Sequence, residues 1–429
     1  MEEQMSPLFY PEKDSWDWNP SSREISNIAQ WKSDFNEVQE FVVSPDGQKV
    51  AALVQNEDET FTPCVNGEIW ESSFEKAWSL KFSPDGRLFC LGMNDDEWTI
   101  IEDDRPWEES FEYVWNLKFS QNGKGAGANI RTSDGYGVLL NGDVWENKFI
   151  QMRSMELSPD GISAAGNIQL EALSEGDVAK FRQGLWNIAV NGRPWDSNFL
   201  NVWDCSFSSD GGIVAAEVRL VSGRQTIAVD GKAWKSDYKA VWKPIFIPGS
   251  RDVIAPALTT EGWKLLLNGD PLWNKPYSQV WRQTIGPDGR KLAAVVSPEF
   301  GRWTIAVDGI SWAKTFGDVV LDPVFSLDGK RTAAAAKDAG EWTVAVDGIP
   351  WPEKFGMVWD PVFSPDGKHV LAKVWRDDSY MLVVDGKITG PAYENLFDFV
   401  FSDDGTKLLI KCVENGLCFR KVIFSKDLT

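Results

Sequence analysis

Residues 364–386 read SPDGKHVLAKVWRDDSYMLVVDG, and this stretch decides the fold that we predict for the whole chain. Its first four residues combine a proline that fixes φ, an aspartate that favours turns and a glycine that accepts a left-handed backbone, so they predict a tight turn. Two apolar runs follow, and Asp385-Gly386 at their end is typical of a type I′ hairpin. The stretch therefore predicts two strands, with a loop between them and a tight turn at either end.

The same turn recurs through the sequence. Ten copies begin at Ser44, Ser83, Ser120, Ser158, Ser208, Ile247, Gly286, Ser326, Ser364 and Ser402. They are 37 to 40 residues apart, except for one interval of 50 residues. A repeat of about 40 residues fits four short strands, A to D, with the Pro-Asp-Gly turn between A and B and the Asn-Gly or Asp-Gly turn between C and D. This is the pattern of a β-propeller blade.

Tryptophan follows the same repeat. Nine indoles are expected in strand D, each four residues before a Phe or Tyr: Trp31, Trp70, Trp107, Trp145, Trp195, Trp234, Trp273, Trp312 and Trp351. Six more fall in strand A and five at the start of strand C. Because large rings bury much apolar surface, a ring at a fixed place in each unit predicts packing between blades. An electron-hopping chain or an aromatic cage for a cation is the alternative.

The two ends of the chain are predicted to share one blade. The last unit supplies strands at 399–402, 407–413 and 417–424 but no fourth strand, whereas residues 27–35 carry the strand D pattern with no A, B or C strand before them. We therefore predict an all-β propeller of about ten four-stranded blades over residues 27–429, after an N-terminal tail at 1–26. Two smaller propellers of five blades each are the alternative, because propellers usually have four to eight blades.

Charge and composition exclude several classes of function. The net charge of −21 opposes binding to nucleic acids and to anionic membrane surfaces, and favours a basic protein partner. The single histidine, His369, rules out a multi-histidine metal site, and the five cysteines form no CxxC pair, so no cofactor is expected. No signal pattern and no 18-residue apolar run occur, which predicts a cytoplasmic protein with no direct membrane insertion.

The loops between strands B and C are acidic, and they are the candidate partner-binding residues. They carry Glu57, Asp58, Glu59, Asp95, Asp96, Glu97, Glu171, Glu175, Asp177, Asp338, Glu341, Asp377 and Asp378. Such loops are commonly only solvated surface; the functional alternative is an acidic face that docks a basic protein. The 50-residue interval places an insertion of about ten residues within 169–184, the best single candidate for a specific contact.

The Ser-Pro-Asp-Gly turn followed by an apolar strand resembles the propeller repeats of the TolB-like family, over residues 38–424. WD40 repeats are a poorer match, because their Gly-His dipeptide cannot recur in a chain with one histidine. The tryptophan-rich, acidic composition is similar to that of the tryptophan-rich cytoplasmic subunit of transmembrane electron-transfer complexes in sulfate-reducing bacteria. That resemblance implies an accessory subunit without a cofactor, which assembles with an iron–sulfur subunit and a membrane cytochrome. Its partners would hold it at the inner membrane.

No nucleophile elbow, phosphate-binding loop or metal-ligand cluster is recognisable in the sequence. The leading hypothesis is therefore a non-catalytic propeller that acts as scaffold or accessory subunit of a multisubunit, membrane-associated redox complex. A hydrolase or lyase with its active site in the central channel is the first alternative. A module that binds peptides or small ligands through exposed tryptophans is the second alternative. The fold alone cannot choose among these three functions.

Overall fold

Side-chain hydrogen bonds hold the repeated turn together in the computed structural model, which describes residues 10–173 and 176–428. In the turn at 364–367 the Ser364 hydroxyl donates to Asp366 Oδ1 at 2.7 Å and accepts from His369 N at 3.0 Å. Gly367 has φ of +72° and its N–H donates to Ser364 O at 2.8 Å. The turn aspartate is therefore structural, as the sequence predicts.

The second turn of each blade is tied to the first. Asp385 Oδ1 accepts from Val370 N at 2.9 Å, so the Asp-Gly turn after strand C is bonded to the start of strand B. Asn66 and Asp347 make the same bond to Val50 and Thr332 in two other blades. Both tight turns thus lie at one end of the blade, and the loop between strands B and C lies at the other.

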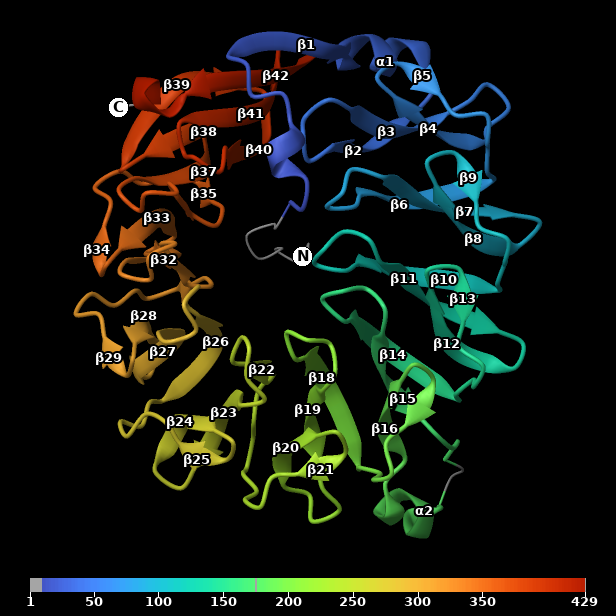
Figure 1. Cartoon of the computed structure of the whole chain (residues 1–429), viewed down its shortest axis with the longest axis vertical. Coiled ribbons are helices and arrows are strands. Elements are labelled where there is room, and N and C mark those ends of the chain that lie inside the picture. Colours follow the sequence, from blue (N-terminus) through green and yellow to red (C-terminus); the bar gives the residue numbers. More distant parts are fainter. Residues whose placement is uncertain (1–9, 174–175, 429) are drawn as a thin grey trace. The chain divides into compact units, whose positions relative to one another are not determined.

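The chain is an all-β propeller of ten four-stranded antiparallel blades, which confirms the predicted fold class (Figure 1). Strands B and C form the core, and Val50 to Val54 in the first blade are all buried. The blades fall into two compact units. Glu12–Ser73 and Tyr277–Thr429 contribute five blades to one unit, and Phe74–Pro276 contributes five to the other.

The first unit holds blades 1, 7, 8, 9 and 10. Its strands are β2 (Val38–Val43), β3 (Val50–Gln55), β4 (Phe61–Val65) and β5 (Glu68–Ile69) in blade 1; β26 (Gln279–Ile285), β27 (Leu292–Glu299), β28 (Arg302–Val307) and β29 (Ile310–Ser311) in blade 7; β30 (Val319–Val320), β31 (Val324–Phe325), β32 (Thr332–Asp338), β33 (Glu341–Val346) and β34 (Ile349–Pro350) in blade 8; β35 (Met357–Val358), β36 (Val362–Phe363), β37 (Val370–Arg376), β38 (Ser379–Val384) and β39 (Lys387–Tyr393) in blade 9; and β40 (Asn395–Phe401), β41 (Lys407–Glu414), β42 (Leu417–Phe424) and β1 (Ser21–Asn27) in blade 10.

The second unit holds blades 2 to 6. Its strands are β6 (Lys76–Phe82), β7 (Leu88–Asn94), β8 (Glu97–Glu102) and β9 (Arg105–Pro106) in blade 2; β10 (Tyr113–Phe119), β11 (Ala126–Thr132), β12 (Gly135–Leu140) and β13 (Asp143–Val144) in blade 3; β14 (Gln151–Leu157), β15 (Ala164–Gln169), β16 (Trp186–Val190) and β17 (Arg193–Pro194) in blade 4; β18 (Asn201–Phe207), β19 (Val214–Arg219), β20 (Gln225–Val229) and β21 (Lys232–Ala233) in blade 5; and β22 (Ile245–Phe246), β23 (Val253–Thr259), β24 (Gly262–Leu267) and β25 (Asp270–Pro271) in blade 6.

The two ends of the chain complete blade 10, but through a different segment from the one predicted. The fourth strand is β1, which pairs antiparallel with β42; Figure 1 shows the blue and red strands side by side. Residues 28–34, predicted as strand D, form the helix α1 (Ile28–Asp34), whose first turn is capped by the Asn27 side chain. The blade therefore begins at Ser21 rather than at residue 27, and part of the predicted tail belongs to the sheet. The 3₁₀ helices η1 (Lys13–Ser15) and η2 (Ser425–Leu428) lie near the ends.

Strands A and D are more irregular than the sequence suggests. In blades 6, 8 and 9 a proline in strand A, at 244, 323 or 361, removes a ladder donor, and the strand is interrupted there. Strand D is two residues long in eight blades and stops just before its tryptophan, so the indole follows the strand instead of lying in it. The Phe or Tyr four residues later rejoins the sheet, as in the bridge between Trp98 and Phe111.

The tryptophan after strand D packs against the neighbouring blade. In six cases the indole lies against the glycine of the next blade's second turn: Trp31 on Gly67, Trp145 on Gly192, Trp195 on Gly231, Trp234 on Gly269, Trp312 on Gly348 and Trp351 on Gly386. Rings of strands A and C pack both within a blade and between blades: Trp281 stacks on Trp303 with centroids 4.6 Å apart, and Trp78 of blade 2 stacks on Tyr113 of blade 3 with centroids 6.4 Å apart. The packing between blades thus involves the indoles that follow strand D and also rings of strands A and C.

Replacing Gly348 with alanine is expected to destabilise the protein by about 2 to 4 kcal/mol. The residue has φ of +82°, which costs a side chain about 1–2 kcal/mol, and its Cβ would lie 3.0 Å from Trp312 Cγ. Gly142→Ala is the matched control, because Gly142 has φ of +91° and no atom within 4 Å of that position. Urea unfolding should show the larger loss for Gly348→Ala; equal losses would mean that the indole does not fix this turn.

Candidate functional site

The acidic residues predicted to bind a partner lie where strands B and C are joined. Glu57, Asp58 and Glu59 join β3 to β4 and are exposed. In blades 2, 8 and 9 the predicted residues lie in or beside the short loops between strands B and C: Asp95, Asp96, Glu97, Asp338, Glu341, Asp377 and Asp378. Glu171 and Asp177 are in the insertion of blade 4, and Glu175 lies outside the described residues. The prediction that they dock a partner stays a prediction.

Two of the acidic pairs have a backbone reason to be aspartate. Asp95 and Asp96 have φ of +52° and +62°, and Asp377 and Asp378 have +51° and +58°. Each pair is the two-residue loop of a hairpin, because the residues on either side of it are paired across the strands. Positive φ at both positions defines a type I′ turn, which aspartate tolerates better than most residues.

Other predicted acids already have partners within the chain. Asp338 Oδ2 lies 3.0 Å from Lys314 Nζ and its Oδ1 accepts from Gly317 N at 2.9 Å. Burial opposes ionisation, but these contacts hold the pKa of Asp338 below its ordinary value. Glu171 Oε2 lies 2.8 Å from Lys180 Nζ, which belongs to the same loop as Glu171. These carboxylates are therefore partly neutralised before any partner arrives.

The insertion of blade 4 forms a short helix, α2 (Val178–Gln183), between β15 and β16. Asp177 caps it, with Oδ1 accepting from Lys180 N at 3.3 Å. Val178 and Phe181 are 57% and 48% exposed, and residues three apart share one face of a helix. The insertion thus presents apolar side chains to solvent, beside Glu171 and Asp177.

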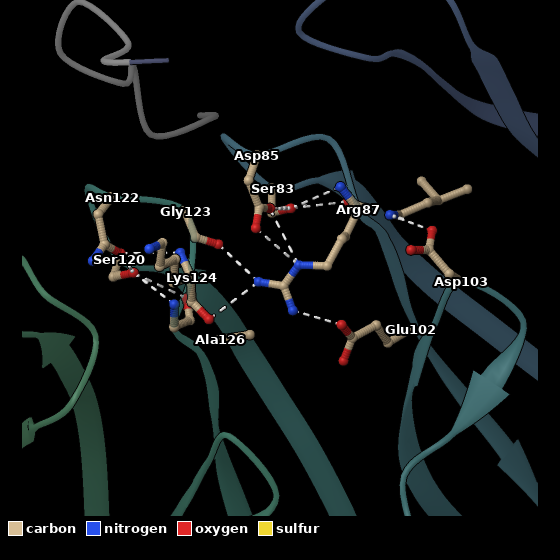
Figure 2. Close-up of polar contacts among 12 residues, drawn as sticks. Ser83, Asp85, Arg87, Glu102, Asp103, Ser120, Asn122, Gly123, Lys124 and Ala126 are labelled. Carbon is tan, nitrogen blue, oxygen red and sulfur yellow. Dashed lines mark hydrogen bonds and ion pairs between the residues drawn. The ribbon is translucent and has the colours of Figure 1, made fainter. Parts of the chain in front are cut away.

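Arginines at the turn end of the blades hold neighbouring blades together. Figure 2 shows the Arg87 guanidinium between its own blade, where it meets Asp85 and Glu102, and the next turn, where it donates to Gly123 O at 2.8 Å and Lys124 O at 3.1 Å. Arg331 donates to Gly367 O and Lys368 O in the same way. These cations have structural partners.

The single histidine belongs to the same set of turn contacts. His369 Nδ1 lies 2.7 Å from Asp385 Oδ2, and Arg331 Nε makes the equivalent contact to Asp347 Oδ2 at 3.0 Å in the blade before. Histidine and arginine therefore fill the same place between the two turns. His369 thus links the two turns of its blade, as Arg331 does in the blade before.

All five cysteines are buried. Cys64, Cys90, Cys205, Cys412 and Cys418 form no disulfide, and burial raises the pKa of Cys64 to about 11 and of Cys205 to about 12. Thiols of this kind are poor nucleophiles. Within residues 10–173 and 176–428, no group of three His, Cys, Asp or Glu is placed to hold a metal ion. In the same ranges, no helix has the length and apolarity to cross a bilayer.

The second unit contains a cavity that was not predicted from the sequence. Its volume is about 440 Å³, and it is lined by Arg153, Ser154, Asn167, Trp203, Asp204, Glu217, Gln225 and Trp242, from blades 4, 5 and 6. Glu217 is 6% exposed, and burial, followed by the nearby Asp204 charge, raises the pKa of Glu217 to about 8. The sequence signal was the glutamate within 214–219, a run that is otherwise buried and apolar up to Arg219.

Comparison with known proteins adds little to this description. No protein-family profile matches the chain, and no curated protein matches it. It is similar to a solved structure described as the crystal structure of the eukaryotic initiation factor, with 12% identity and a TM-score of 0.47 over 83% of this chain and 96% of the other. It is also similar to the Dos1 propeller, with 11% identity and a TM-score of 0.38 over 94% and 95%. Neither score carries an argument about function.

Proposed function

We propose that the protein is a non-catalytic propeller that serves as an accessory subunit and binds a basic partner protein through the insertion of blade 4. The observation that carries this proposal is the exposed apolar pair Val178 and Phe181 on α2. An apolar pair costs free energy in water and gains it when a partner covers it. The net charge of −21 favours a basic surface on that partner.

We further propose that the partner belongs to a membrane-associated redox complex at the cytoplasmic side of the inner membrane. The resemblance of the tryptophan-rich, acidic sequence to the cytoplasmic subunit of transmembrane electron-transfer complexes supports this. In such a complex the chain would carry no redox group of its own. Its role would be to hold or modulate subunits that do.

Capture of the tagged protein from its native cell at low salt, followed by mass spectrometry, tests both steps. We expect a partner with a basic surface that is lost from the double variant Val178→Ser, Phe181→Ser. Phe300→Ser is the matched control, because Phe300 is also exposed in a loop between strands B and C and should leave capture unchanged. Recovery of the free chain alone, or equal capture by both variants, would contradict the scaffold proposal. Partners without any redox cofactor would contradict its redox part.

A further inference from the structure

The cavity of blades 4 to 6 contains a buried carboxyl group that its surroundings do not satisfy. Glu217 lies at the fourth position of strand B in blade 5, opposite the bulge of strand A between Val202 and Cys205. Within the part of the chain that the structure describes, neither Glu217 nor Asp204 forms a hydrogen bond or ion pair. The oxygens of Glu217 open into the cavity instead of being sealed in the core, so a ligand that enters the cavity can reach a carboxyl group that no described donor binds.

Three other blades show how a polar side chain at this place is bonded. In blade 4 the equivalent residue is Asn167, whose Oδ1 accepts from Arg153 N at 3.2 Å and Ser154 N at 2.7 Å in the bulge. In blade 3, Asn129 Oδ1 accepts from the Asn116 side chain at 2.8 Å. Blade 10 has a lysine at this place, Lys411, with Nζ 3.1 Å from Asp398 Oδ2. An amide or a cation therefore meets the bulge in those blades, whereas blade 5 sets a carboxyl group against a second carboxyl group.

The cations near Glu217 are already engaged. Glu156 Oε1 lies 3.3 Å from both Lys118 Nζ and Lys243 Nζ; burial lowers the pKa of Lys243, but the charges of Glu156 and Asp204 outweigh it and raise that pKa. The Arg153 guanidinium lies over the Trp186 ring, 3.6 Å from its centroid, and donates to Asn201 Oδ1 at 2.9 Å. None of these cations is paired with the Glu217 carboxyl group.

The remaining lining is aromatic. Trp203 and Trp242 border the cavity, and Trp242 is 39% exposed while it stacks on Trp263 with centroids 5.2 Å apart. Indole rings attract cations through their π faces, most strongly where water is excluded. The two amide oxygens in the lining are already used, because Gln225 Oε1 accepts from Val241 N and Asn167 Oδ1 accepts from the bulge. That leaves few oxygens for a metal such as Ca²⁺, which takes six to eight.

We propose that this cavity binds a small alkylammonium cation, whose charge is balanced by Glu217 and Asp204. The methyl or methylene groups of the ligand pack against Trp203 and Trp242. A cavity of about 440 Å³ is within the range of small-ligand sites. The cation can come from a free small molecule, such as a choline-like compound, or from a methylated lysine side chain of a peptide.

Protonation of Glu217 should be coupled to this binding. At neutral pH the raised pKa keeps a proton on Glu217, and an arriving cation displaces it. Binding therefore releases protons at pH 7 and becomes tighter from pH 6 to pH 8. The groups that set this titration are Asp204 on β18, Arg153 and Glu156 on β14, Lys118 on β10 and Lys243 before β22.

Calorimetric titration of the full chain tests the proposal. We use choline, its neutral isostere 3,3-dimethyl-1-butanol, and a short peptide with and without Nε-trimethyllysine. Choline or the trimethyllysine peptide should bind at least about tenfold more tightly than its uncharged or unmethylated counterpart, and the one that binds identifies the source. Binding by neither cation, or equal binding of the neutral isostere, would overturn the proposal.

Two variants and one control locate the site. Glu217→Gln should weaken the cation by at least about tenfold and abolish proton release, measured as the difference in heat between two buffers. Trp242→Ala, at a partly exposed side chain, gives an independent loss if Glu217→Gln does not fold. Asp360→Asn is the matched control: Asp360 follows the tryptophan of strand A in blade 9, as Asp204 does in blade 5, and burial raises its pKa to about 6. Unchanged binding in Glu217→Gln and Trp242→Ala would rule out this cavity.

Discussion

Glu217→Gln is expected to stabilise the protein at pH 8 and above, and to make its stability less dependent on pH. In the folded chain the pKa of Glu217 is about 8, against 4.5 for an ordinary glutamate. The folded state therefore binds more protons than the unfolded state between these values, so wild-type stability falls as pH rises from about 4.5 to 8. A shift of this size corresponds to a loss on the order of 4 kcal/mol across that window. Glutamine cannot ionise and avoids this loss.

Urea unfolding at pH 5, 7 and 9 measures the effect. The difference between Glu217→Gln and the wild type should be small at pH 5 and largest at pH 9. Glu57→Gln controls for the general effect of removing one negative charge, because Glu57 is exposed; it should shift stability by less than about 0.5 kcal/mol. Parallel pH profiles for the wild type and Glu217→Gln would show that the fold does not hold this carboxyl group neutral.

The blades could be predicted because their turns obey local rules. The bonds of the first turn, made by Ser364, Asp366 and Gly367, reach no further than five residues along the chain. Asp385 bonds to Val370, which is 15 residues away. Because all the hydrogen-bonding partners of a turn lie within one short segment, the turn can be recognised from the sequence of that segment alone. The number of such segments then gives the number of blades.

The N-terminal strand shows what such rules miss. Trp31 and Phe35 repeat the spacing of strand D, yet the residues around them form α1 because Asn27 caps a helix there. The indole of Trp31 still lies against Gly67 of the next blade, as Trp312 lies against Gly348. The repeat thus preserves the contact between ring and turn. It does not fix the secondary structure of the segment that carries the ring.

The cavity could not be predicted for a related reason. A single glutamate in the run 214–219 can equally be a tolerated substitution on a strand, and its meaning depends on what lies opposite. The bulge in β18 places Asp204 close enough to Glu217 to help raise the pKa of Glu217, after burial. The adjoining blades bring Trp242 and Arg153 to the same cavity. Bulges and neighbouring blades are set by packing between distant segments. They leave no signature at residue 217 itself.

Arg420→Ala is expected to destabilise blade 10 and its contact with blade 1 by about 3 to 5 kcal/mol. Arg420 is 1% exposed on β42; its Nε donates to Asp46 O at 2.8 Å, and its other donors reach the Asp17 carbonyl. Loss of the side chain leaves a cavity beside Gly47 and removes the donor from the carbonyl groups of half-buried Asp46 and exposed Asp17. Because Asp17 precedes β1 and Asp46 follows β2, one guanidinium links the last strand to both segments.

The residue opposite Arg420 on β1, Arg23, provides the control for this prediction. Arg23 on β1 is directly opposite Arg420 but is exposed, with its main contact to the Gln48 side chain, so Arg23→Ala should cost less than about 1 kcal/mol. Arg420→Lys should fall between the two, because it keeps the charge without the fork of donors. Hydrogen exchange should then show faster opening of β1 and β42 in Arg420→Ala than in Arg23→Ala. If the two alanine variants opened alike, the pairing of β1 with β42 would itself close the blade, and the buried cation would be replaceable.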